Sequence, residues 1–165
     1  MQPLSFSKDL VFESERLSFR GISSDDTENL VRWRSRKDVY EYSNNPKPIT
    51  VSEHLLWLSG YMARSNEFRA IITDKVTGKD IGMLGGIYKN GAFVTSYYIG
   101  ELEYRGKGLA VEAIQALIVF LNMIKITKIQ AYTHVNNIAS ISCLIKIGFR
   151  LVSCDGLTRL YEYVM

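Results

Sequence analysis

The chain has 165 residues, of which 47% are hydrophobic and 22% charged, so it is expected to form one soluble globular domain with a buried core. Its net charge of +3 is compatible with an anionic ligand but gives no argument for nucleic acid as a partner. We find no secretory signal at the start and no apolar run of membrane-spanning length, which predicts a cytoplasmic protein without a membrane partner. The only cysteines, Cys143 and Cys154, suit a reducing compartment and lack metal-ligand spacing, so no metal is expected.

The first half of the chain predicts one strand followed by two helices. Residues 15–22 alternate as a strand does, and residues 23–40 form one helical pattern that its first serines can cap. After a break rich in proline and asparagine, Thr50 and Glu53 have the spacing of a capping box, which predicts the start of the second helix.

From residue 67 onward the pattern changes to strands joined by turns, and then to alternating helices and strands. Asn90-Gly91 is a strong hairpin signal between two of these strands. We expect strands at 67–73, 81–88, 92–100, 128–135, 150–154 and 158–164, and helices at about 109–125 and 138–148. This order predicts a single α+β domain over residues 1–165, with a mixed, mostly antiparallel central sheet flanked by helices.

Two glycines and a cation, in Arg105-Gly106-Lys107-Gly108, lie between a predicted strand and a predicted helix. The spacing does not fit a phosphate-loop NTPase, which has four residues between its glycines and a Ser or Thr after the lysine. A dinucleotide-binding fingerprint fits poorly too, because Val111 occupies the position of its third glycine. A helix N-terminus whose free N–H groups bind a diphosphate fits the stretch, and so does an ordinary glycine turn.

The stretch from Arg105 to Ala110 matches the R/Q-x-x-G-x-G/A signature of the GNAT superfamily, the acetyl-CoA-dependent N-acetyltransferases. Further along, Asn137 to Ser140 and Lys146 to Phe149 are similar to that family's N-x-x-S and K-x-G-F elements. The segment Glu15 to Arg20 resembles the first strand of the RimJ/RimL-type subgroup, which acetylates the N-termini of ribosomal proteins. The resemblance covers residues 14–152, and its motifs stand in the family's order.

The resemblance implies a GNAT-like domain that uses acetyl-CoA as its co-substrate and transfers the acetyl group directly to an amine. The backbone of Gly100 and Leu102 would pair with the pantetheine arm, and Asn137 would contact the same arm. The pyrophosphate of coenzyme A would be held by the main-chain amides of Arg105, Gly106, Lys107, Gly108, Leu109 and Ala110. The strand that precedes this loop would splay from its neighbour.

Two departures from the family's pattern concern catalysis. Many members have a tyrosine that serves the departing thiolate, and here that position is Leu144, so we expect Ser140 to take this role. Some relatives carry a glutamate early in the strand before the loop, whereas residues 92–95 contain no acid. An α-amine needs about 1 pKa unit of help to lose its proton at pH 7 and a lysine needs about 3, so the missing glutamate favours an α-amine or an amino sugar. Glu101 is the candidate catalytic base near the acetyl site, although an exposed loop carboxylate fits it equally.

Residues of the predicted helices are candidates for binding the acceptor. Arg32 belongs to a basic run that suits an anionic substrate, and a solvated helix face explains the same run. Arg32 and Arg36 are expected to share one face of this helix. The segment containing Glu53, His54 and Trp57 resembles acetyltransferases of nucleotide-linked amino sugars, while capping, solvation and core packing remain the structural explanations of these three residues.

The sequence therefore predicts an N-acetyltransferase whose acceptor is a protein N-terminus, slightly favoured, or an amino sugar carried on a nucleotide. A non-catalytic module that binds coenzyme A or nucleic acid is the alternative from another class. The pattern also permits a homodimer.

Overall fold

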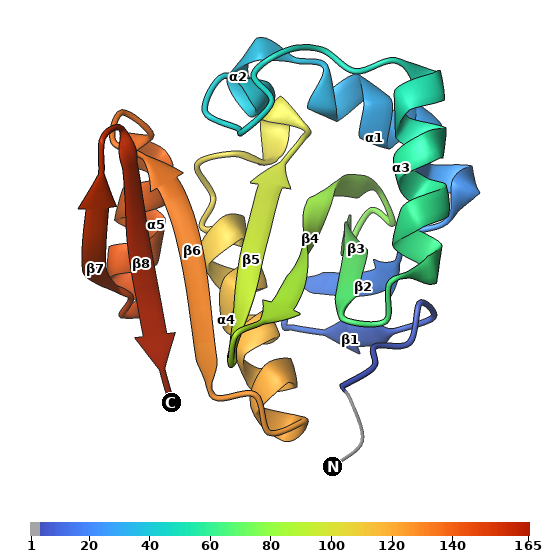
Figure 1. Cartoon of the computed structure of the whole chain (residues 1–165). Coiled ribbons are helices and arrows are strands. Elements are labelled where there is room, and N and C mark those ends of the chain that lie inside the picture. The colour runs from blue at the N-terminus through green and yellow to red at the C-terminus, as the bar shows by residue number, and fades with distance from the viewer. Residues whose placement is uncertain (1–3) are drawn as a thin grey trace.

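The computed structural model describes residues 4–165, which form one open sheet with helices on both faces (Figure 1). The eight strands are arranged in the order β1-β2-β3-β4-β5-β6-β8-β7. All neighbours are antiparallel except β5 and β6, which are parallel. The strands are β1 (Val11–Glu13), β2 (Leu17–Gly21), β3 (Glu67–Asp74), β4 (Asp80–Lys89), β5 (Ala92–Ile99), β6 (Lys128–His134), β7 (Arg150–Asp155) and β8 (Thr158–Val164). The predicted α+β class with a mostly antiparallel sheet is confirmed.

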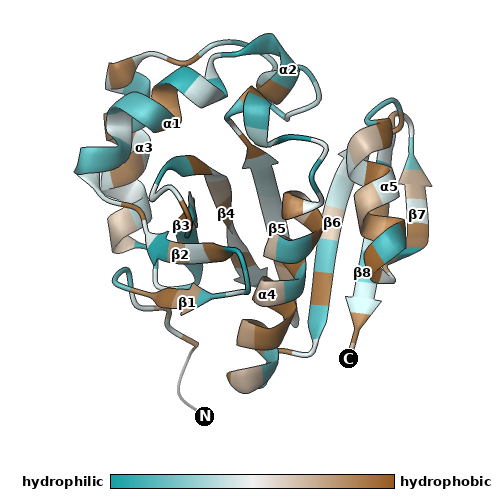
Figure 2. Ribbon diagram, turned by 180° about the vertical axis from the view of Figure 1, so that it is seen from behind, coloured by the Kyte–Doolittle hydropathy of each residue, from teal (hydrophilic) through white to brown (hydrophobic). Residues whose placement is uncertain are grey.

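Five α-helices and two 3-10 turns are described, and α4 and α5 cover one face of the sheet (Figure 2). The helices are α1 (Thr27–Arg34), α2 (Lys37–Tyr40), α3 (Val51–Ala63), α4 (Leu109–Met123) and α5 (Ile138–Ile147), and the 3-10 turns are η1 (Ser24–Asp26) and η2 (Leu102–Tyr104).

Alternation along β3 divides the core between the two faces of the sheet. Phe68, Ala70 and Ile72 join the larger cluster, which includes the buried residues of α4 and α5. Ile71 points the other way and packs with residues of α1 and α3 in a smaller cluster that contains Trp33. The helices α1 and α3 are thereby fixed on the face of the sheet opposite α4.

Several local predictions are confirmed where the signal lies in neighbouring residues. Thr50 and Glu53 form the predicted capping box that begins α3. Of the two asparagines before α5, it is Asn137 whose side chain caps the helix. Asn90 and Gly91 both have positive φ, as a two-residue hairpin turn of type I′ requires. Gly148 ends α5 with a φ of 117°, a conformation that glycine adopts without strain.

The prediction of one helix over residues 23–40 is wrong, because the chain breaks between α1 and α2. Ser35 exchanges hydrogen bonds with the backbone of Ile49 through its hydroxyl, and Arg36 is extended, with its guanidinium donating to the Gly100 carbonyl at 2.8 Å. We had expected Arg36 to share a helix face with Arg32, and this prediction is wrong because Arg36 lies outside α1. The short strand β1, which pairs with β2, was also missed.

The parallel pair β5 and β6 separates after only two residues. Phe93 pairs with Ile129 and Val94 with Gln130, and no later residue of β5 pairs with β6. The other edge of β5 remains paired with β4 up to Ile99, and β6 remains paired with β8 over its whole length. Two backbone edges, Thr95–Ile99 and Ala131–His134, thus face an opening within the sheet, and the predicted splay is confirmed.

Candidate active site

The loop before α4 presents a row of main-chain N–H groups without partners. Gly106 and Gly108 both have a φ of 73°, and Gly108 is the residue that precedes the helix. Within residues 4–165, no hydrogen bond is formed by the N–H groups of residues 106–111, whereas the Arg105 N–H donates to the Leu102 carbonyl at 3.1 Å. Free N–H groups at the positive end of a 15-residue helix dipole make an anion-binding site.

Glycine leaves the space beside this loop open. A Cβ at Gly106 would meet no atom within 4 Å, and a Cβ at Gly108 would meet only the Arg16 guanidinium at 3.8 Å. Both positions are therefore accessible from solvent, so an anion can approach the main chain closely.

The two charged side chains of the loop, Arg105 and Lys107, contact other residues of the chain. The Arg105 guanidinium donates to the Ile99 carbonyl at 2.9 Å and pairs with Asp38 of α2. Lys107 lies over the Tyr104 ring, 5.6 Å from its centroid. Arg105 thus anchors the loop to α2, and the anion site consists mainly of backbone groups.

Arg16 and Glu112 tie this loop to the first strands. The Arg16 guanidinium donates to the Lys107 carbonyl at 3.0 Å, and the Glu112 carboxylate accepts from the Arg16 N–H and the Ser14 hydroxyl, each at 2.7 Å. Burial alone would raise the pKa of Glu112, but these bonds and the Arg16 guanidinium outweigh it and lower that pKa. Glu112 thus has a structural role at the start of α4.

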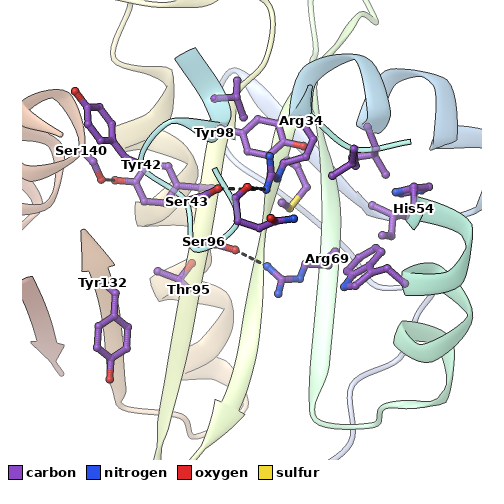
Figure 3. Close-up of a pocket in the computed structure, with 18 of the residues that line it drawn as sticks. Arg34, Tyr42, Ser43, His54, Arg69, Thr95, Ser96, Tyr98, Tyr132 and Ser140 are labelled. Carbon is purple, nitrogen blue, oxygen red and sulfur yellow. Dashed lines mark hydrogen bonds between the residues drawn. The ribbon is translucent and has the colours of Figure 1, made fainter. Parts of the chain in front are cut away.

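A cavity of about 610 Å³ extends from the splayed strands toward α1 and α3. In Figure 3 Ser140 lies at one end of it and His54 at the other. The cavity is lined by Ile22, Leu30, Arg34, Val39, Tyr42, Ser43, Asn45, Ile49, Glu53, His54, Trp57, Arg69, Met83, Thr95, Ser96, Tyr97, Tyr98, Ala131, Tyr132, Asn137 and Ser140. The cavity therefore opens beside the splay between β5 and β6.

The cavity has a surplus of positive charge. Its charged lining residues are Arg34, Arg69 and Glu53, and Glu53 is engaged in the α3 capping box. Arg34 donates to the carbonyls of Asn45 at 2.6 Å and Lys47 at 3.1 Å, and no carboxylate within residues 4–165 pairs with it. Desolvation lowers the pKa of Arg34, although the guanidinium remains charged at neutral pH.

Arg69, the second cation of the cavity, shares its carboxylate partner with another arginine. Its guanidinium bonds to Glu67 at 2.8 Å and to Ser96 (Figure 3), and Glu67 also accepts from Arg64 at 2.6 Å. Burial would raise the pKa of Glu67, but the two arginines outweigh it and lower that pKa. One carboxylate between two guanidinium groups leaves a net positive charge at this wall.

His54 is a buried, uncharged group at the far end of the cavity. Its side chain is 4% exposed, and its Nε2 atom has no hydrogen-bond partner within residues 4–165. Desolvation lowers the pKa of His54, so the imidazole is neutral at pH 7. A buried ring nitrogen without a partner is available to a polar group of a ligand.

Five of the sequence-predicted site residues line the cavity. Glu53, His54, Trp57, Asn137 and Ser140 line the cavity together, although they come from distant parts of the sequence.

Arg32 and Glu101 do not line the cavity but pair with each other across the start of η2. Glu101 also accepts from the Trp33 indole at 3.0 Å. The Arg32 bond, which outweighs burial, and the Trp33 bond lower the pKa of Glu101, so this carboxylate is a weak base. Its contacts are those of an anchor between loop and α1.

The backbone of Gly100 is also occupied within the chain, since its N–H donates to Ile81 at 2.7 Å and its carbonyl accepts from Arg36. Leu102 N–H has no partner among the described residues. The edge of β5 before Gly100, which does not pair with β6, is thus more open than the backbone of Gly100.

Sequence reasoning missed Arg34, Arg69 and Tyr97. The loop carbonyls that accept from Arg34 could not be assigned from sequence. The double tyrosine at 97 and 98 was the one available signal, because two aromatic residues in a strand place one on each face of the sheet.

Two further observations concern residues 4–165 as a whole. No helix in this part of the chain is long and apolar enough to span a bilayer. No three His, Cys, Asp or Glu side chains in it are grouped closely enough to hold a metal ion.

Comparison with known proteins shows the family. The model of the acetyltransferase (GNAT) domain matches residues 16–150. The uncharacterized N-acetyltransferase p20 of Bacillus licheniformis is 30% identical over 161 residues, covering 90% of this chain and 85% of that protein.

Solved structures share the fold. A domain from Methanocaldococcus jannaschii superposes with a TM-score of 0.82 at 24% identity, covering 91% of this chain and 99% of that one. RimL, a ribosomal L7/L12 α-N-protein acetyltransferase in complex with coenzyme A, has a TM-score of 0.82 at 18% identity, with 94% and 98% covered.

The chain therefore belongs to the GNAT acetyltransferase family. It is an acetyl-CoA-dependent N-acetyltransferase, and its co-substrate is acetyl-CoA.

Proposed function

We propose that this enzyme acetylates the primary amine of a compact anionic acceptor, with a nucleotide-linked amino sugar as the substrate class. The observation that carries the proposal is the surplus positive charge of the cavity at Arg34 and Arg69. The reaction has three requirements: a place for the donor, a group that stabilises the departing thiolate, and a site for the acceptor.

The donor binds along the loop and the splay. The free N–H groups of residues 106–111 hold the pyrophosphate, in agreement with the open space at Gly106 and Gly108. The pantetheine arm lies in the opening between β5 and β6 and pairs with the unpaired edge of β5. Asn137 uses its side-chain oxygen to cap α5 at 3.3 Å, which leaves its NH₂ group for the same arm.

The thioester then lies near Ser140, at the start of α5 and at the end of the cavity. The amine attacks the carbonyl carbon, the N–C bond forms and the C–S bond breaks. Ser140 donates a hydrogen bond to the sulfur as negative charge develops there. The amine loses one proton in the reaction, and the departing thiolate gains one to become the thiol of coenzyme A.

The acceptor occupies the rest of the cavity. Arg34 and Arg69 bind its phosphate groups, because guanidinium groups pair with phosphate bidentately. The exposed aromatic rings of Tyr42, Trp57 and Tyr132 provide flat surfaces for a base or sugar ring. The first residues of β5, up to Thr95, include no carboxylate that could remove a proton from the amine. An acceptor amine with a pKa near 8 suits this site, because it needs little help to lose its proton.

A protein N-terminus is the second candidate, and the fold shared with RimL favours it. Such a substrate also has a weakly basic α-amine. It carries no phosphate, however, so it leaves the charge of Arg34 without a partner. We favour the nucleotide-linked amino sugar for this reason, in place of the slight preference for a protein N-terminus drawn from the sequence.

The two acceptor classes are separated by a thiol-release assay with acetyl-CoA. A nucleoside-diphosphate-linked 4-amino sugar is compared with short peptides that have a free N-terminus. Arg34→Gln is expected to reduce kcat/KM for the sugar nucleotide by about 10- to 100-fold, the loss of one charge-assisted hydrogen bond. Arg150→Gln, on the exposed strand β7, removes the same charge at a residue that does not line the cavity and serves as the control.

Peptide turnover that exceeds sugar-nucleotide turnover and is insensitive to Arg34→Gln would exclude the sugar-nucleotide assignment. A thiol-release rate with the sugar nucleotide that falls steeply with salt only when Arg34 is present would support it.

A further inference from the structure

A tyrosine from the splayed part of β5 contacts the serine that serves the leaving group. The Tyr97 and Ser140 hydroxyl oxygens are 2.8 Å apart, and both residues line the cavity. Tyr97 lies three residues beyond the last pair of β5 and β6, so its side chain bridges the opening to reach α5. The residue is not part of any motif in the sequence.

The surroundings keep the Tyr97 phenol protonated. Burial is the main reason that its pKa is raised far above the ordinary value of tyrosine, and the neighbouring Cys143 adds to the effect. Burial likewise raises the pKa of the Cys143 thiol, so the group beside Tyr97 is uncharged at neutral pH. The charged groups that line the cavity, Arg34, Arg69 and Glu53, make no hydrogen bond to Tyr97.

The chemistry of the two hydroxyls favours one direction for their hydrogen bond. A thiol is a weak acceptor, so the strongest acceptor beside the Tyr97 O–H is the Ser140 oxygen. If Tyr97 donates to Ser140, the serine keeps its own proton free for the cavity. The reverse direction would turn that proton away from the cavity and leave the phenol proton with sulfur alone.

We propose that Tyr97 is a positioning residue, which donates to the Ser140 oxygen and so directs the Ser140 proton at the sulfur of coenzyme A. The inference rests on the thiolate-stabilising role proposed for Ser140. No proton moves from Tyr97 in the reaction, since it only polarises and orients the serine hydroxyl. Two hydroxyls in series would thus do the work for which other family members use the tyrosine replaced here by Leu144.

The ionisation of bound coenzyme A tests both roles without any acceptor. The thiolate absorbance of the enzyme–CoA complex is titrated with pH, and the desulfo-CoA complex is subtracted to remove the protein's own cysteines and tyrosines. Ser140→Ala is expected to raise the pKa of the bound thiol by about one unit, and Tyr97→Phe by about half a unit to one unit. Tyr88→Phe removes a half-buried phenol outside the cavity and is expected to change nothing.

The outcomes distinguish the two claims. If Ser140→Ala leaves the thiol pKa unchanged, the role of Ser140 fails and the role of Tyr97 fails with it. If Ser140→Ala raises it and Tyr97→Phe does not, only the role of Tyr97 fails.

A double-mutant cycle on kcat adds a second test. Tyr97→Phe is expected to lower kcat by about fivefold in the parent enzyme and to have almost no effect in the Ser140→Ala background, because Tyr97 acts through Ser140. An equal loss in both backgrounds would reduce Tyr97 to a packing residue.

Discussion

Replacing Gly108 by tryptophan tests the proposed pyrophosphate site. Gly108 precedes α4 with a φ of 73°, and a Cβ at this position would meet only the Arg16 guanidinium at 3.8 Å. The indole would therefore stand in the open space beside the free N–H groups rather than displace the core. Gly91→Trp is the matched control, because Gly91 has a φ of 80° and equally open surroundings at the opposite end of β5.

The structure sets the expected magnitudes. A residue other than glycine in the left-handed region costs about 1–2 kcal/mol, which is similar for both variants and small against a domain stability of about 5–15 kcal/mol. Loss of three N–H bonds to the pyrophosphate, at about 1.5–3 kcal/mol each, weakens coenzyme binding by about 5 kcal/mol or more. This corresponds to at least about a thousandfold rise in Kd.

Isothermal titration with acetyl-CoA measures the affinity, and thermal unfolding without ligand measures the folding cost. We expect both variants to unfold at similar, slightly lowered temperatures, and only Gly108→Trp to lose the coenzyme. Unchanged affinity in Gly108→Trp would refute the pyrophosphate assignment. An equal loss of affinity in Gly91→Trp would show that strain, and not blocked amides, is responsible.

Three further predictions concern stability. Glu112→Ala removes the acceptor of the Ser14 and Arg16 bonds and is expected to lower the free energy of unfolding in urea by about 2 kcal/mol. The pKa values of Glu112 and Glu101 are lowered in the folded protein, so the stabilisation from these carboxylates is complete above the unfolded pKa near 4.3 and is lost as the pH falls toward the folded pKa values. We therefore expect Tm to fall between pH 7 and pH 3, and to fall less in Glu112→Gln. Gly148→Ala places a Cβ at a φ of 117°, 3.4 Å from Tyr163, and should lower stability by at least about 1 kcal/mol, whereas an unchanged Tm would contradict the strain assigned to this turn.

Short-range signals made several elements predictable from sequence. The capping box at Thr50, the Asn90-Gly91 turn and the Gly148 helix end each depend on residues within four positions of one another. The Gly106-Lys107-Gly108 loop was found for the same reason. The position of this loop next to the splay follows from the order β5, loop and α4, and this order can be seen in the sequence.

Features set by distant contacts were not predictable. The break after α1 depends on the Ile49 backbone 14 residues away, and the Glu101 pair depends on Arg32, 69 residues away. The charge of the cavity depends on Arg34 and on the number of carboxylates that reach it. Composition and spacing do not indicate which distant residue a long charged side chain bonds to.

The opening between β5 and β6 also has a consequence for the protein before it meets its substrates. Thr95–Ile99 and Ala131–His134 form two interior strand edges, and exposed edges recruit other strands. If the pantetheine arm binds in this opening, as proposed, it would act as a temporary ninth strand in addition to supplying the acetyl group. Coenzyme binding would then also stabilise the folded state, by about 2.7 kcal/mol when the coenzyme is at 100 times its Kd.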